Sequence, residues 1–211
     1  MACPICNKRK PKRLCPARAE SICSICCGTE REVTIDCPAD CVHLAASREY
    51  DLTRLEYDWS KAPFPEVKFD RRFPERYGPL LLEFDYATCE FAAEHRELVD
   101  TDVLAALQML AETYRTQANG IIYEKPPDYP LQRGLYERLK AAIKSIREKL
   151  AQQLGLTALR DSEIRDALIF LTQLCAMHVN GRPKGRAYLD IIRQQFPKAE
   201  FQRAASNIVL L

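Results

Sequence analysis

Apolar residues recur at the three- and four-residue spacing of α-helices through most of the chain beyond residue 79. Capping residues and glycines divide this pattern into segments, because Ser, Thr, Asp and Asn favour helix starts and Gly favours helix ends. The sequence thus predicts a mostly α fold, with an all-α bundle of five or six helices over residues 80–211. The predicted helices cover about residues 80–98, 101–118, 131–154, 162–180, 186–196 and 201–208.

Residues 51–79 interrupt this pattern with four prolines and six aromatic residues. Prolines break helices and favour extended chain, whereas a free linker would be rich in glycine and serine. We therefore expect a connecting strap without regular structure, whose rings pack against the helical bundle. The alternative is an aromatic groove that binds a ligand or peptide.

The first 50 residues hold eight of the ten cysteines and form a predicted metal-binding module. The spacing includes two CxxC pairs and one CxxxC pair, and each pair can present two sulfurs to one ion. Thiolates are soft ligands, so the expected cofactor is Zn²⁺, with two ions for eight thiols and iron as the weaker alternative. The predicted ligands are Cys3, Cys6, Cys15, Cys23, Cys26, Cys27, Cys37 and Cys41.

The start of the chain bears on whether these cysteines bind metal or form disulfides. Met1 is followed at once by a CxxC pair and a basic run, without the apolar segment of a signal peptide. This favours the reducing cytoplasm, where cysteines bind metal or stay free more often than they form disulfides. No stretch of about 18 apolar residues occurs, so no membrane span and no membrane partner are expected.

Several groupings of the eight cysteines fit. The favoured grouping keeps each pair intact and interleaves the pairs as in a cross-brace. The alternatives exchange Cys26 with Cys27, or replace one cysteine with His43. The favoured groups are Cys3, Cys6, Cys23 and Cys26 for one ion, and Cys15, Cys27, Cys37 and Cys41 for the other.

The last cysteine pair also suggests a helix. Pro38 suits the first helical position and Asp40 the positive end of the helix dipole, so we expect Cys37 at a helix cap and Cys41 in the first turn. The head thereby resembles cross-brace and treble-clef zinc modules in general, although its spacing departs from the RING, MYND and HIT patterns. Because thiolates can fill every position, the sites are expected to be structural rather than catalytic.

Two basic clusters are candidates for phosphate or nucleic-acid contact. Other interpretations are a protein-docking surface or compensation of thiolate charge, since zinc with four thiolates carries a formal charge of −2. The second cluster lies in a glycine-containing turn between two helices, where a solvated turn is the simplest interpretation. The candidate contacts are Lys8, Arg9, Lys10, Lys12, Arg13, Arg182, Lys184 and Arg186.

The net charge and the absence of known catalytic motifs restrict the possible classes of function only in part. The net charge of +2 favours no class of partner, and the sequence has no Gly-rich phosphate loop, GxSxG or HExxH motif. Cys89, Cys175, His95 and His178 are expected to be core or surface residues rather than ligands. We therefore expect a non-enzymatic cytoplasmic interaction or adaptor protein that binds a protein partner. The alternatives are a nucleic-acid-binding regulator that uses Lys8–Arg13, and a thiol-based redox sensor.

Overall fold

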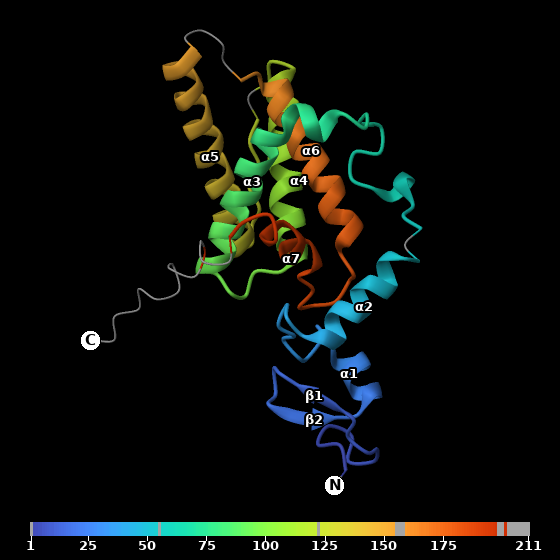
Figure 1. Ribbon diagram of the computed structural model, residues 1–211. Helices are drawn as coiled ribbons and strands as arrows, with labels where there is room; N and C mark the ends of the chain where they lie inside the picture. Colours follow the sequence, from blue (N-terminus) through green and yellow to red (C-terminus); the bar gives the residue numbers. More distant parts are fainter. Residues whose placement is uncertain (1, 55, 122, 155–158, 198–200, 202–211) are drawn as a thin grey trace, which may run out of the picture. The chain divides into compact units, whose positions relative to one another are not determined.

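The computed structural model describes residues 2–54, 56–121, 123–154, 159–197 and 201 (Figure 1). Helices make up 58% of the chain and strands 4%, so the predicted predominance of helices is confirmed. The chain divides into two compact units. The N-terminal unit comprises Met1–Tyr57 and Asn180–Ala187, and the helical unit comprises Asp58–Val179 and Tyr188–Leu211.

The N-terminal unit contains a small antiparallel hairpin and two helices (Figure 1). The hairpin consists of β1 (Arg13–Cys15) and β2 (Glu20–Ile22), and the helices are α1 (Ser24–Glu30) and α2 (Val42–Leu52). The buried residues of its core are mostly cysteines, so apolar burial alone contributes little to its stability. These core residues are Cys3, Cys15, Ile22, Cys23, Cys26 and Ile35.

The expected helix cap at Cys37 is wrong. Helix α2 begins at Val42, and Cys41 is its N-cap in extended backbone. The amide of Cys41 donates to the carbonyl of Pro38 at 3.0 Å, so these residues close a turn ahead of the helix. Proline and aspartate favour turns as well as first helical turns, and here the turn is the one that forms.

Within the described residues, the helical unit contains the long helices α3 to α6 and the short helix α7 (Figure 1). Helix α4 packs against both α5 and α6, and α3 packs against α5 and α6, so apolar faces of all four contribute to one buried core. The largest fully buried side chains of this core include Phe84, Leu107, Leu139 and Ile164. The helices are α3 (Phe73–Glu94), α4 (Asp100–Ala118), α5 (Pro130–Leu154), α6 (Asp161–His178) and α7 (Ala187–Arg193).

Helix α3 begins at Phe73, earlier than the proline content of this region suggested. Pro74 lies in the first helical turn, where its missing amide costs no hydrogen bond, and Pro79 lies farther inside the helix. The predicted final helix falls mostly on residues 202–211, which are outside the described residues.

The strap before α3 is attached to α6 through one buried side chain. The Nε2 atom of Gln173 donates to the carbonyls of Pro63, Phe64 and Val67 at 3.0–3.2 Å. Phe64 is buried, and the ring of Phe69 meets that of Phe170 edge-on, which agrees with a packed strap and not with an open aromatic groove. The short 3₁₀ helix Trp59–Lys61 lies at the start of the strap, where Trp59 is exposed.

The start of α7 is held by a buried carboxylate. The amides of Tyr188 and Leu189 donate to the two oxygens of Asp100 at 2.9 and 3.1 Å. Asp100 is the first residue of α4, so the same aspartate lies at the positive end of two helices. These two hydrogen bonds anchor the chain at Tyr188, the residue at which the second segment of the helical unit begins.

Candidate metal centre

Cys3 and Cys6 lie in a tight loop at the start of the chain. The amide of Cys3 donates to the carbonyl of Arg9 at 2.7 Å, and the amide of Asn7 donates to the carbonyl of Cys3 at 2.8 Å. Asn7 has a φ of 53°, in the left-handed region that asparagine tolerates better than most residues. The loop therefore folds back on itself and presents both sulfurs to one point.

Cys23 and Cys26 lie at the start of α1. Cys23 is the N-cap, and its Sγ atom accepts a hydrogen bond from the amide of Cys26 at 3.4 Å. The amide of Cys23 in turn donates to Sγ of Cys3 at 3.3 Å. The β1–β2 hairpin reverses the chain between the two pairs, so the helix start returns to the first loop.

The sulfur atoms of Cys3, Cys6, Cys23 and Cys26 all lie within 4.8 Å of one another, and those of Cys6 and Cys23 are 4.0 Å apart. Four Zn–S bonds of about 2.3 Å in a tetrahedron would place the sulfurs about 3.8 Å apart, whereas a disulfide requires about 2.05 Å. All four cysteines are free thiols. The arrangement is therefore compatible with a four-sulfur metal site, and its members are those of the first predicted group.

The electrostatics of this group also favour a cation. Backbone amides of Lys8 and Arg9 lower the pKa of Cys6 to about 6. Burial, reinforced by the neighbouring thiols, raises the pKa of Cys26 to about 12. Negative charge on one sulfur thus opposes ionisation of the next, and a bound cation would relieve that opposition for all four.

Among the described residues, the four sulfurs of the second predicted group do not all lie within 4.8 Å of one another as those of the first group do. Cys27 lies beside two arginines, with Nη1 of Arg13 at 3.5 Å and Nη2 of Arg31 at 3.8 Å from its sulfur. Burial opposes ionisation of Cys27, but these two arginines outweigh it and lower its pKa. A second metal site at Cys15, Cys27, Cys37 and Cys41 stays a prediction.

Cys37 and His43 lie near this second group. Burial raises the pKa of Cys37, the backbone amide of Glu32 opposes the rise, and the charges of Cys41 and Cys15 add to it. His43 is half-buried, and burial lowers its pKa. His43 is outside the group of four close sulfurs, and so is Cys27, so neither alternative grouping is what the structure shows at the first site.

The two basic clusters differ in their surroundings. Lys8, Arg9, Lys10 and Lys12 are exposed, and they form no ion pair within the part of the chain that the structure describes. Arg13 is half-buried and donates to Cys27. Four of the five cations in the first cluster are therefore open to a partner.

The second cluster contacts the N-terminal unit's own segment 28–36. Arg182 and Lys184 donate to backbone carbonyls of this segment, and Arg186 pairs with Asp36. Sequence reasoning missed these contacts, because they join residues about 150 positions apart and leave no local signal. Only the two glycines of the turn indicated unusual backbone geometry.

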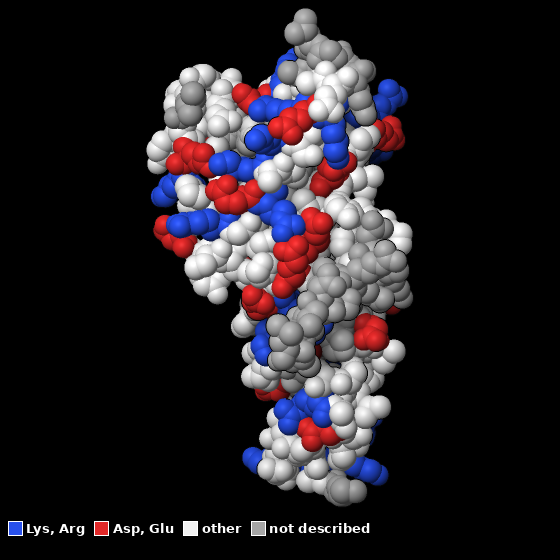
Figure 2. Space-filling model, turned by 90° about the vertical axis from the view of Figure 1, so that its left-hand side faces the viewer, with Lys and Arg blue, Asp and Glu red and all other residues white. Residues whose placement is uncertain are grey.

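Elsewhere the charged side chains of both signs are interspersed. Figure 2 shows Lys and Arg alternating with Asp and Glu over the face in view, in keeping with the net charge of +2. On this face there is no broad field of one sign that would attract a polyanion over a long distance.

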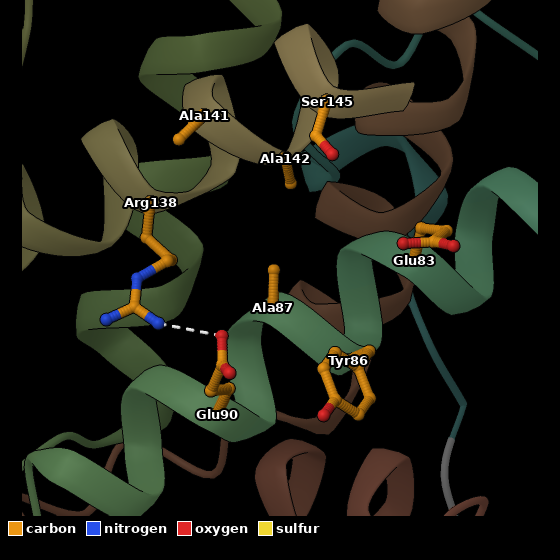
Figure 3. Close-up of a pocket in the computed structure, with 8 residues that line it drawn as sticks. All are labelled: Glu83, Tyr86, Ala87, Glu90, Arg138, Ala141, Ala142 and Ser145. Atoms are coloured by element: carbon orange, nitrogen blue, oxygen red, sulfur yellow. Dashed lines mark hydrogen bonds and ion pairs between the residues drawn. The ribbon is translucent and has the colours of Figure 1, made fainter. Parts of the chain in front are cut away.

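A shallow groove lies between α3 and α5 (Figure 3). Its polar groups are largely engaged with one another, since Arg138 pairs with Glu90 at 2.7 Å and with Glu94 at 2.6 Å. The remaining lining is mostly small or apolar, so the groove offers little chemistry of its own. The lining residues are Glu83, Tyr86, Ala87, Glu90, Arg138, Ala141, Ala142 and Ser145.

Comparison with known proteins finds no matching family model, no matching curated protein and no matching solved structure. Within the described residues, none of the helices combines the length and the apolar character that crossing a bilayer requires. The function is therefore inferred from the four close cysteines and their surroundings.

Proposed function

We propose that Cys3, Cys6, Cys23 and Cys26 bind one structural Zn²⁺ ion, and that this ion folds the head of a non-enzymatic interaction protein. The observation that carries this proposal is the close approach of the four sulfurs. Four thiolates fill the tetrahedral coordination of zinc and leave no position for water or substrate, as is typical of structural sites. The order of loop, hairpin and helix start resembles that of treble-clef modules.

Exposed apolar side chains on the N-terminal unit support a protein partner. Leu14, Ile25 and Val42 are 68%, 51% and 73% exposed. A metal ion would hold the backbone beneath them rigid, so these side chains could bind a partner at little entropic cost. All ten cysteines are free thiols, which suits the cytoplasm and its reducing conditions.

We also propose a second Zn²⁺ ion at Cys15, Cys27, Cys37 and Cys41. These residues lie in the same unit as the first site, and Cys37 is near enough to Cys15 and Cys41 for their charges to act on it. Cys27 would bind this ion through its sulfur, which can still accept hydrogen bonds from Arg13 and Arg31. The expected metal content is then two ions per chain, against one if only the first site binds.

Nucleic-acid binding is the second candidate function. The observation that favours it is the exposure of Lys8, Arg9, Lys10 and Lys12, which lie next to the first metal site on a loop that it would hold rigid. The cations of the second cluster already have partners in the N-terminal unit. A nucleic-acid surface would therefore use the first cluster alone.

Metal content tests the leading proposal. The chain, purified with zinc and then freed of excess metal, is expected to hold at least one equivalent of zinc by mass spectrometry under native conditions. The double variant Cys3→Ser with Cys6→Ser is expected to lose one equivalent, whereas Cys89→Ala, a change in the helical unit, is expected to keep all of it. A wild-type chain without bound zinc would refute the proposal.

Salt dependence tests the nucleic-acid candidate. The plot of log affinity against log salt has a negative slope. If four phosphates are contacted, changing Lys8, Arg9, Lys10 and Lys12 to Ser should reduce the magnitude of that slope by about 3 to 4. A charge-matched control changes exposed cations of the helical unit to Ser and is expected to keep the slope. If the first set of changes leaves binding as it was, this candidate fails. The control positions are Lys68, Arg71, Lys125 and Lys144.

A further inference from the structure

Segment Asn180–Ala187, here named the clasp, belongs to the N-terminal unit although most of that unit precedes residue 58. Nη1 of Arg182 donates to the carbonyl of Gly28 at 3.3 Å and also to that of Arg31. Gly28 lies in the last turn of α1, and Arg31 is its C-cap. Arg182 thus supplies donors to carbonyls at the C-terminal end of this helix, where the helix itself offers none.

Glu32 is the second point of attachment. It is 2% exposed, and its carboxylate accepts from Nδ2 of Asn180 at 2.9 Å and from Nη2 of Arg48 at 2.7 Å. Its carbonyl accepts from the amide of Lys184 at 2.8 Å. A buried carboxylate is costly unless it is paired and hydrogen-bonded, so Asn180 of the clasp adds a second donor to the pairing that Arg48 provides.

Two further contacts extend the clasp along the same segment. Nζ of Lys184 donates to the carbonyl of Thr34 at 2.8 Å, and Arg186 forms an ion pair with Asp36. The contacts therefore extend from the end of α1 to Asp36. Asp36 directly precedes Cys37, which is a ligand of the proposed second site.

The backbone of the clasp is shaped for this contact. Gly181 has a φ of 70°, which glycine adopts without strain. A Cβ atom at Gly185 would lie 2.6 Å from Oδ1 of Asn180, and that oxygen already accepts from the amide of Arg182 at 3.0 Å. The conformation of the turn thus requires glycine at both positions.

Helix α1 connects the clasp to the metal site. It has seven residues, too few to be stable alone, since isolated helices below about 12 residues are marginal in water. Cys23 is its N-cap and Cys26 lies in its first turn, and its last turn is held by Arg182. Metal and clasp therefore stabilise the same short helix from opposite ends.

We propose that the clasp is a remote determinant of metal binding, with Arg182 as a positioning residue that holds α1 and hence two of the four ligands. This inference rests on the proposed zinc site. Because coupling between two binding events is reciprocal, the clasp strengthens metal binding and the metal strengthens closure of the clasp. The clasp would thereby be held more firmly when the four cysteines bind metal than when they do not.

Zinc transfer to a chromogenic chelator tests the first half of this proposal in the full chain. Arg182→Ala is expected to release zinc about tenfold faster than wild type. Arg182→Lys restores a donor and is expected to recover part of the difference. The matched control Arg71→Ala, an exposed arginine of the helical unit, is expected to release zinc at the wild-type rate.

Hydrogen exchange of the wild-type chain tests the second half and needs no variant. When zinc is removed, the amide of Lys184 is expected to lose its protection and exchange at least tenfold faster. The amides of Tyr188 and Leu189 serve as an internal reference, because they donate to Asp100 within the helical unit and are expected to keep their protection.

The outcomes separate the two proposals. If the wild-type chain holds no zinc, the proposed metal site fails, and this inference fails with it. If zinc is bound but Arg182→Ala releases it at the wild-type rate, and Lys184 exchanges equally with and without zinc, the clasp is independent of the metal and only the inference is overturned. Faster release from Arg182→Ala together with metal-dependent exchange at Lys184 supports it.

Discussion

The sulfurs of Cys6 and Cys23 lie 4.0 Å apart although 17 positions separate the residues in the chain. That distance is close to the edge of a zinc tetrathiolate tetrahedron and about twice the length of a disulfide. The hairpin between them and the amides that donate to the sulfurs produce this approach. The backbone path, as well as the number of cysteines, is therefore compatible with metal binding.

Removal of the metal is expected to unfold the N-terminal unit and to leave the helical unit folded. The N-terminal core consists mostly of cysteines, whereas the helical unit has a large apolar core of its own. With a strong chelator, amides of α1 and α2 should exchange freely while those of α4 and α6 stay protected. Equal loss of protection in both units, or in neither, would contradict a structural metal confined to the N-terminal unit.

Asp85 is expected to make stability depend on pH. Burial raises its pKa to about 6, even though Gln195 and Tyr188 donate to the carboxylate. The folded chain thus keeps this proton to higher pH than the unfolded chain, so the free energy of unfolding falls as pH rises from about 4 to about 6.

Asp85→Asn removes this titration. It is expected to raise the free energy of unfolding by roughly 1–3 kcal/mol at pH 7.5, and by much less at pH 4. Urea unfolding at both pH values measures the difference, with the fully exposed Asp128→Asn as the control. An equal effect of Asp85→Asn at the two pH values would mean that burial of the charge is not its cause.

Gln173→Leu is expected to loosen the strap. The side-chain amide supplies donors to three strap carbonyls, and leucine of similar size would leave them without that donor. The expected loss is about 1–3 kcal/mol of unfolding free energy, the usual cost of unpaired buried polar groups. The exposed Gln108→Leu in α4 is the matched control, and a loss no larger than the control's would show that the strap is held by its rings instead.

The sequence predicted the helices of the helical unit because their apolar positions repeat over many turns, as at Leu135, Leu139 and Ile143 on α5. It also predicted which four cysteines lie together, because CxxC pairs constrain their own geometry. Shorter elements gave no such repeat. The three-residue strands β1 and β2 and the seven-residue α1 depend on contacts around the cysteines rather than on periodicity.

Two features could not be predicted because their causes lie elsewhere in the chain. Cys41 caps α2 only because Pro38 and its neighbours close a turn before it. The local sequence favours a solvated turn at Arg182, whereas its partners Gly28 and Arg31 lie about 150 residues away in the chain. Local chemistry suggested an anion site for the clasp, whereas backbone carbonyls and the carboxylates of Glu32 and Asp36 are the partners that it has.

X-ray absorption at the zinc edge of the purified chain tests the central claim most directly. The account predicts a first shell of four sulfurs at about 2.3 Å, and the loss of one zinc equivalent when Cys3 and Cys6 are both changed to Ser. A first shell that contains nitrogen or oxygen ligands, or a zinc content that these two substitutions leave unchanged, would contradict it.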